Sequence, residues 1–215
     1  TIDDAGRVSA WQSYGNNTDT SVADVTVDQT TVSAGTMVLS GNNTGSLVYI
    51  NNLNDKRLTK VVLPLSDNMS TSLDVQFSED GVNGWGIYNG AAEGSGSVIL
   101  DNSWGLGSYK TIAGITTSAT SMTIPEAWKF TSTTDGTKSL YLRVRDAAGN
   151  ITTSSTSSSI ILDTTNPVVP VTAITSPISG ASWMGGSSQN ITWNTAGILD
   201  ATAGLTTAPI KLEYS

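Results

Sequence analysis

The chain has 215 residues with a net charge of −8 and a sequence pI near 4.3, and 38% hydrophobic and 13% charged residues are typical of a globular protein. It contains neither Cys nor His, which excludes disulfides, Cys/His zinc sites and His-dependent catalysis. The few basic residues are scattered, which argues against nucleic acid as a partner, and no apolar run reaches the roughly 20 residues that span a bilayer, so no membrane insertion is expected.

Short segments of alternating apolar and polar residues follow one another along the chain, separated by Gly, Asn and Asp clusters typical of turns. In the segment 72–78, Leu73, Val75 and Phe77 fall on one face, and the intervening polar residues fall on the other. This alternation predicts a half-buried strand. We therefore predict an all-β fold, with strands at residues 6–11, 22–28, 36–40, 47–50, 58–65, 72–78 and 140–145.

An Asp-x-Ala-Gly-x turn occurs twice, at residues 3–7 and 146–150, and a predicted strand ending in Asp follows each copy, at Asp28 and Asp163. Repetition of this kind predicts β domains in tandem. We expect three units. Residues 1–30 would be the closing strands of a preceding or neighbouring domain, residues 31–167 one complete sandwich of roughly eight to ten short strands, and residues 168–215 the opening half of a further domain.

The most specific motifs lie in residues 128–167. They are Trp128-Lys129-Phe130, Asp135-Gly136-Thr137-Lys138, the run from Leu140 to Asn150, and the run from Ile160 to Pro167. Together with Ser78-Glu79-Asp80-Gly81 they resemble bacterial immunoglobulin-like repeats of large surface proteins. The stretch between residues 86 and 124 departs from that pattern and is interpreted as a loop insertion.

A second resemblance begins at Ile174. The segments 175–183, 185–187, 191–193 and 210–215 are similar to the front half of an immunoglobulin-like module found in Ser/Thr-rich wall-associated proteins. Half a sandwich has open sheet edges. Either the natural chain continues, or residues 1–28 of a neighbouring copy complete the sheet, which would grow a head-to-tail filament.

These resemblances imply a non-catalytic, extracellular structural or adhesive protein of a prokaryotic cell surface, such as a surface layer, sheath, filament or adhesin stalk. The partners would be flanking domains or other copies of the chain, with a cell-surface glycan as a further candidate. No set of residues predicts catalysis, so we do not expect an enzyme. The alternative is an accessory carbohydrate-binding β module of a secreted glycan-active enzyme.

Three kinds of site are predicted. Asp146, Asp163 and Asn166 offer the oxygen ligands that Ca²⁺ prefers, although the same residue types also serve ordinary turns. No other cofactor is expected. Four aromatic residues of the insertion region could stack on glycans or form a loop-covering hydrophobic cluster, and three Asn-x-Ser/Thr turns could carry glycan. The aromatic residues are Trp85, Tyr88, Trp104 and Tyr109, and the acceptor residues are Asn16, Asn42 and Asn68.

Overall fold

The computed structural model describes residues 27–41, 49–51, 56–90, 96–153, 158–202 and 204–205. These residues form strands and loops, with no helix among them, which confirms the predicted all-β class. Within the same ranges there is accordingly no helix long and apolar enough to cross a membrane. The strands predicted within residues 1–26 lie outside the described residues.

The first of two large sheets is organised around β4 (Lys60–Ser66). Strands β1 (Ser33–Ala34) and β2 (Val38–Ser40) pair antiparallel with successive parts of β4, and β9 (Thr120–Pro125) also pairs with it antiparallel. Every second side chain of β4 is buried, as expected for a strand with one face on a core.

The second sheet is organised around β10 (Gly136–Arg145) and β5 (Ser72–Ser78), and β5 has the bounds that the sequence predicts. The strand order is β3-β12-β10-β5-β6-β7, with β11 paired to β10 and β8 paired to β5. All pairs are antiparallel except β3–β12, which is parallel. The other strands are β3 (Tyr49–Ile50), β6 (Gly86–Tyr88), β7 (Val98–Leu100), β8 (Lys110–Ala113), β11 (Ile151–Thr153) and β12 (Ser158–Leu162).

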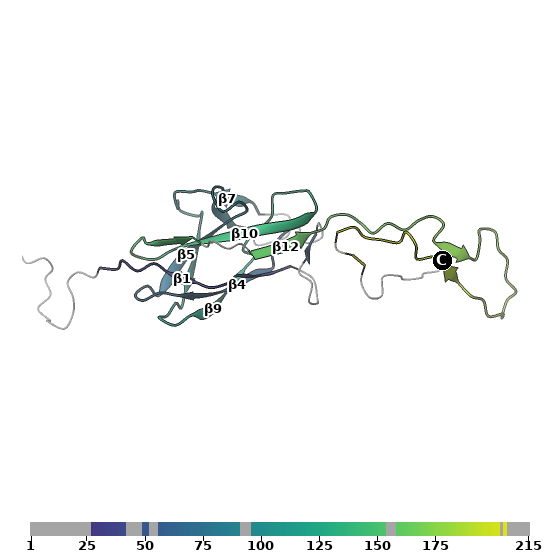
Figure 1. Cartoon of the computed structure of the whole chain (residues 1–215), viewed down its shortest axis with the longest axis horizontal. Coiled ribbons are helices and arrows are strands. Elements are labelled where there is room, and N and C mark those ends of the chain that lie inside the picture. Colours follow the sequence, from purple (N-terminus) through teal and green to yellow (C-terminus); the bar gives the residue numbers. More distant parts are fainter. Residues whose placement is uncertain are drawn as a thin grey trace, which may run out of the picture.

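One hydrophobic core joins the two sheets, giving a sandwich-like arrangement (Figure 1). Each buried Leu, Val or Phe of this core contributes roughly 1.5–3 kcal/mol to folding relative to an exposed side chain. The inward-facing residues of the three central strands are at most 1% exposed: Val61, Leu63 and Leu65 of β4, Leu73, Val75 and Phe77 of β5, and Leu140, Leu142 and Val144 of β10.

The other face of β5 is also covered, so the prediction of a half-buried strand is wrong for its second half. Gln76 and Ser78 are 0% exposed. The Gln76 amide Nε2 donates to the backbone oxygens of Asp101 at 3.0 Å and Ser108 at 2.7 Å. The segment between β7 and β8 therefore lies over this face of the sheet and removes it from solvent.

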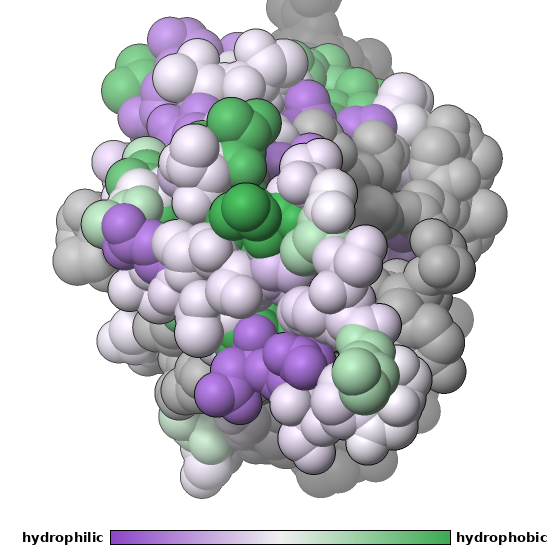
Figure 2. Space-filling model, turned by 90° about the vertical axis from the view of Figure 1, so that its right-hand side faces the viewer, coloured by the Kyte–Doolittle hydropathy of each residue, from purple (hydrophilic) through white to green (hydrophobic). Residues whose placement is uncertain are grey.

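Beyond the end of β12 the chain continues into a separate two-stranded sheet, in which β13 (Ile174–Ser176) pairs antiparallel with β14 (Thr192–Trp193) (Figure 1). Figure 2 shows the molecule from the right-hand side of Figure 1, where apolar residues lie among polar ones on the surface. Trp193 of β14 is 43% exposed. The large apolar side chains exposed in this part are Val168, Val169, Val171, Ile174, Ile178, Trp183, Met184, Ile191, Trp193, Leu199 and Leu205.

Candidate metal centre

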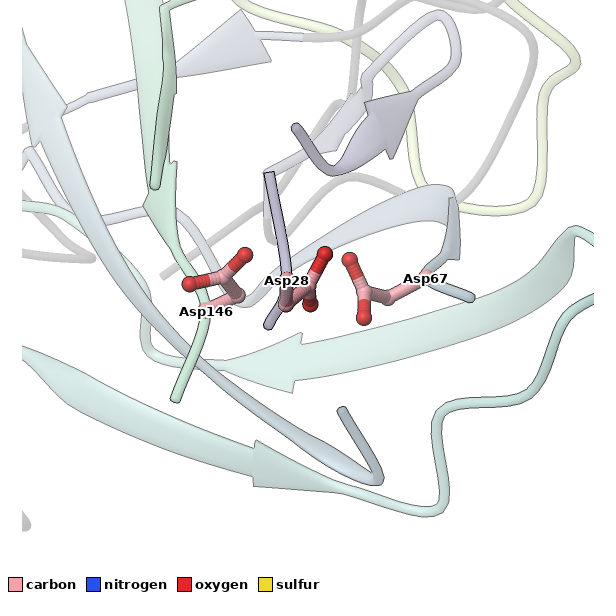
Figure 3. Close-up of side chains that lie close together, drawn as sticks. All are labelled: Asp28, Asp67 and Asp146. Carbon is pink, nitrogen blue, oxygen red and sulfur yellow. The ribbon is translucent and has the colours of Figure 1, made fainter. Parts of the chain in front are cut away.

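Three aspartates from distant parts of the sequence meet at one end of the sandwich (Figure 3). Asp28 precedes β1, Asp67 follows β4, and Asp146 follows β10. Each offers a carboxylate oxygen that lies within 4.8 Å of those of the other two. In Figure 3 the Asp28 carboxylate lies between the other two.

The strand pairings bring the three residues together. Ser33 of β1 pairs with Ser66 of β4, so the segment that enters the sandwich reaches the loop containing Asp67. Arg145, the last residue of β10, pairs with Asp74 near the start of β5. Because the β4–β5 loop leads directly into β5, Asp146 lies at the same end of the sandwich as this loop.

The carboxylates of Asp28 and Asp67 each have one oxygen that accepts hydrogen bonds within its own turn and one oxygen without a partner. Asp67 Oδ1 accepts hydrogen bonds from the backbone N–H of Met69 at 3.0 Å and of Ser70 at 2.6 Å. Asp28 Oδ1 accepts from the N–H of Thr30 at 3.0 Å. The Oδ2 atoms of both aspartates are buried and accept no hydrogen bond.

Asp146 is held by the turn that follows β10. Its Oδ1 accepts from the backbone N–H of Asn150 at 2.8 Å, and its Oδ2 accepts from the Asn150 amide at 2.8 Å. Gly149 has a φ of 94°, a conformation that glycine adopts without steric cost. The same Asn150 amide also donates to the backbone oxygens of Asp28 at 3.1 Å and Thr30 at 3.3 Å. Asn150 therefore connects the turn to the entering segment.

No ion pair joins a Lys or Arg of the described ranges to any of these carboxylates; Arg145 pairs with Asp74 instead, at 2.8 Å. Asp67 is 5% exposed and Asp146 4% exposed. Such a group offers oxygen ligands only, which suits hard divalent cations and not metals that prefer nitrogen or sulfur.

The metal site predicted from sequence is only partly the one observed. Asp146 belongs to the cluster, whereas Asp163 and Asn166 lie at the opposite end of the sandwich, because β12 runs antiparallel to β10 and Leu162 pairs with Gly136. There the Asp163 N–H donates to the Ile50 oxygen at 3.0 Å, and Asn166 is exposed. The three predicted residues therefore do not form one site.

Sequence reasoning missed Asp67 and gave Asp28 no ligand role. One local signal was available, since Asp67 and Asp146 directly follow a strand and Asp28 ends a predicted one. Asp101 and Asp163 share that signal, because they directly follow β7 and β12. Only the pairing of strands distinguishes these three from the others.

The predicted glycan-binding aromatics pack inside the protein. The Arg143 guanidinium lies 5.0 Å from the Trp85 ring centroid and 4.7 Å from that of Trp104, and Arg145 lies 4.7 Å from Trp104 and 5.3 Å from Tyr109. Cationic groups and aromatic rings thus alternate along the outer face of β10.

Burial removes most of these rings from solvent. Trp85 is 4% exposed, Tyr88 0% and Trp104 8%, while Tyr109 is partly buried. A sugar stacks on an accessible ring face, and the faces here are occupied by arginines and loop residues. This packing favours the loop-covering cluster over a glycan-binding surface.

A hydrogen-bond network joins the segment between β7 and β8 to the strands beneath it. Arg143 Nε donates to Gln76 Oε1 at 2.7 Å, Nη2 also contacts that oxygen, and Nη2 donates to the Asn102 backbone oxygen at 2.9 Å. Burial lowers the pKa of the Arg143 guanidinium, and the neighbouring Asp101 carboxylate opposes that shift. The network fixes the position of the covering loop on the strands.

An open cavity of about 150 Å³ borders the loop after β5. Glu79 lines this cavity, and its Oε1 accepts hydrogen bonds from Trp128 Nε1 at 3.2 Å and from the N–H of Thr131 at 2.9 Å. Glu79 thereby holds the loop after β9 in place. We assign the cavity no ligand.

Of the three predicted glycosylation residues, Asn16 and Asn42 lie outside the described residues. Asn68 is exposed, and its amide donates to Thr30 Oγ1 at 3.2 Å. This contact adds another link between the β4–β5 loop and the entering segment.

In comparisons with known proteins, no family model and no curated protein matches this chain.

Proposed function

We propose that the chain is part of a non-catalytic, extracellular structural protein built from immunoglobulin-like domains in series, and that its work is mechanical. The observation that supports this proposal best is an internal repeat of strand pairing. Five positions after Asp28, Ser33 pairs with Ser66, which directly precedes Asp67. Five positions after Asp163, Val168 pairs with Leu199, which directly precedes Asp200.

The agreement extends to the next strand pair. In the sandwich, β2 pairs with the first half of β4, with Val38 opposite Val62. In the C-terminal part, β13 pairs with β14, with Ile174 opposite Trp193, at nearly the same distances along the chain from Asp163 and Asp200. The part after residue 167 thus repeats the pairing pattern with which the sandwich begins, and this supports domains in series.

The arrangement of the sandwich also supports a spacer. The segment 27–32 enters at one end and the chain leaves after β12 at the other (Figure 1). In the immunoglobulin-like interpretation, β1 and β2, β4 and β9 form one sheet, and β5, β10 and β12 form the other. Domains with opposite points of attachment add their lengths in an array.

The parallel pair β3–β12 gives this sandwich a means of resisting tension. Ile161 lies opposite Tyr49, and the Asp163 N–H donates to the Ile50 oxygen at 3.0 Å. Pulling β12 outward while the opposite end is held loads these bonds along the strand direction, so several must break together. When two neighbouring strands are instead pulled apart at the end they share, the hydrogen bonds between them break one at a time.

Single-molecule pulling tests the proposal. Because the chain has no Cys, Gln29→Cys and Asn166→Cys provide two exposed attachment points at opposite ends of the sandwich. We expect one cooperative rupture at a higher force than in a second double variant, Thr133→Cys with Asn166→Cys, whose attachment points lie at the same end of β10 and β12, so that β12 is peeled from β10. End-to-end forces equal to or below the peeling force would contradict a mechanical role.

A further inference from the structure

We propose that Asp28, Asp67 and Asp146 bind one Ca²⁺, and that the bound ion fixes the segment entering the sandwich to the end of the domain. This inference does not rest on the proposed function, because a cation could bind here in a protein of any activity. It rests on the orphaned oxygens, their separation and the segments that supply them.

The orphaned oxygens point to a ligand. Asp67 is 5% exposed, its Oδ1 is bound to two turn N–H groups, and its Oδ2 is buried without a hydrogen bond. Asp28 Oδ2 is likewise buried and has no hydrogen bond. Buried polar atoms in proteins are almost always paired, and a buried charge is paired or coordinates a metal. A cation among the three carboxylates would satisfy both orphaned oxygens.

The separation of the oxygens suits calcium. Ca²⁺ binds oxygen at about 2.3–2.6 Å, so ligands on opposite sides of the ion are about 5 Å apart. The three carboxylate oxygens lie within 4.8 Å of one another, so one ion can contact all three. Six to eight ligands are usual for Ca²⁺, and water can supply those that the aspartates do not.

The origin of the ligands favours Ca²⁺ over Mg²⁺. The three aspartates come from an entering segment, a loop and a turn, and local hydrogen bonds already orient each carboxylate. Ca²⁺ tolerates such irregular geometry, whereas Mg²⁺ requires a near-ideal octahedron and gives up its waters reluctantly. We expect Mg²⁺ to compete weakly.

Asp28 makes the site a clamp. Asp67 and Asp146 belong to the sandwich, but Asp28 precedes its first strand. Four hydrogen bonds already cross this boundary: from Asn150 to the oxygens of Asp28 and Thr30, from Asn68 to Thr30, and from Thr152 to the Val32 oxygen. Hydrogen bonds of this kind are individually weak. A shared ion would couple the entering segment to two elements of the sandwich at once.

Calorimetric titration of the chelator-treated full chain with CaCl₂, and separately with MgCl₂, tests binding. We expect Ca²⁺ affinity in the range of about 10⁻⁴–10⁻³ M that is typical of extracellular modules. Asp67→Asn and Asp28→Asn should each weaken Ca²⁺ binding at least about tenfold, because each removes one charged ligand. Asp80→Asn is the matched control, since Asp80 is an exposed aspartate whose Oδ1 also accepts from turn N–H groups.

Hydrogen exchange tests the clamp separately. Ca²⁺ should slow exchange of the Thr30 amide, which donates to Asp28, in the unaltered chain but not in Asp67→Asn. The Val82 amide, which donates to Asp80 in a comparable turn, should be unaffected. Circular dichroism confirms that each variant folds.

Failure to bind Ca²⁺, or equal binding by the unaltered chain and both cluster variants, would overturn the metal site. Binding that depends on Asp67 but leaves the Thr30 amide unchanged would overturn the clamp.

Discussion

At the scale of single residues, two groups of aspartates among the described residues differ in their environment. Asp80, Asp101 and Asp135 accept hydrogen bonds from nearby turn groups, which lowers the pKa of each carboxyl below its usual value of 3.8. Asp67 also serves a turn with one oxygen, but its other oxygen is buried without a partner. The first kind of aspartate stabilises a loop, and the second kind leaves a buried oxygen free to bind a ligand.

Asp135 provides a test of the aspartates that accept hydrogen bonds from nearby turn groups. Hydrogen bonds from the Thr164 and Thr165 hydroxyls, at 2.6 and 2.5 Å, are the main reason that the pKa of Asp135 is lowered. A lowered pKa stabilises the fold above the unfolded value of 3.8, and that contribution is lost as the pH falls through the lower folded value. Asp135→Asn should therefore reduce the free energy of unfolding at neutral pH, and the deficit should shrink below pH 3.8.

Denaturant titrations from neutral pH down to pH 2 measure this dependence. Asp80→Asn should behave in the same way, because hydrogen bonds from Val82 and Asn83 lower the pKa of Asp80. A deficit in Asp135→Asn that stays constant over the whole pH range would show that the ionised form of Asp135 contributes nothing.

At the scale of elements, the segment between β7 and β8 covers the outer face of β5 and β10 in the second sheet. It brings Trp104 over Arg143 and Arg145, and Trp104 has a φ of 62°, which is unusual for a bulky residue. The strained backbone and the buried ring occur at the same position. We infer that packing of the indole compensates for the backbone conformation.

Trp104→Ala should lower the free energy of unfolding by about 3–5 kcal/mol, the cost usual for removing a large buried aromatic side chain. Leu106→Ala is the control from the same loop: Leu106 is 97% exposed, and its loss should change stability by less than about 0.5 kcal/mol. Equilibrium unfolding in urea measures both. Similar effects of the two substitutions would mean that the loop does not cover the sheet in solution.

At the scale of the whole molecule, the sandwich and the part after residue 167 differ in how completely they bury apolar side chains. Trp128 in the sandwich is 1% exposed, whereas Trp193 in β14 is 43% exposed. The sandwich core includes residues of both sheets, and none of its members comes from the two-stranded sheet. We therefore expect the sandwich to be stable independently of β13 and β14.

Trp128→Ala should destabilise the sandwich by about 3–5 kcal/mol, and Trp193→Ala should leave its stability unchanged within about 0.5 kcal/mol. Native-state hydrogen exchange of the β5 and β10 amides reports on the sandwich alone. Faster exchange of these amides in Trp193→Ala would show that the two parts are energetically coupled.

The amino-acid sequence by itself determined the fold class and the inward face of the central strands. Alternation along residues 72–78 and 140–145 is a local property, so it predicts which side chains of β5 and β10 enter the core. Turn residues likewise predict where strands end, because their backbone preferences act over a few positions.

Only the tertiary structure decided what covers the outer face of β5 and which aspartates meet. Burial of Gln76 depends on a loop 25 to 32 residues further along the chain, and the carboxylate cluster depends on the pairing of β1 with β4 and of β5 with β10. Periodicity along a strand carries no information about such contacts, because it specifies a face and not the segment that packs on it. The candidate metal centre is therefore a product of topology, assembled from an entering segment, a loop and a turn that look ordinary in the sequence.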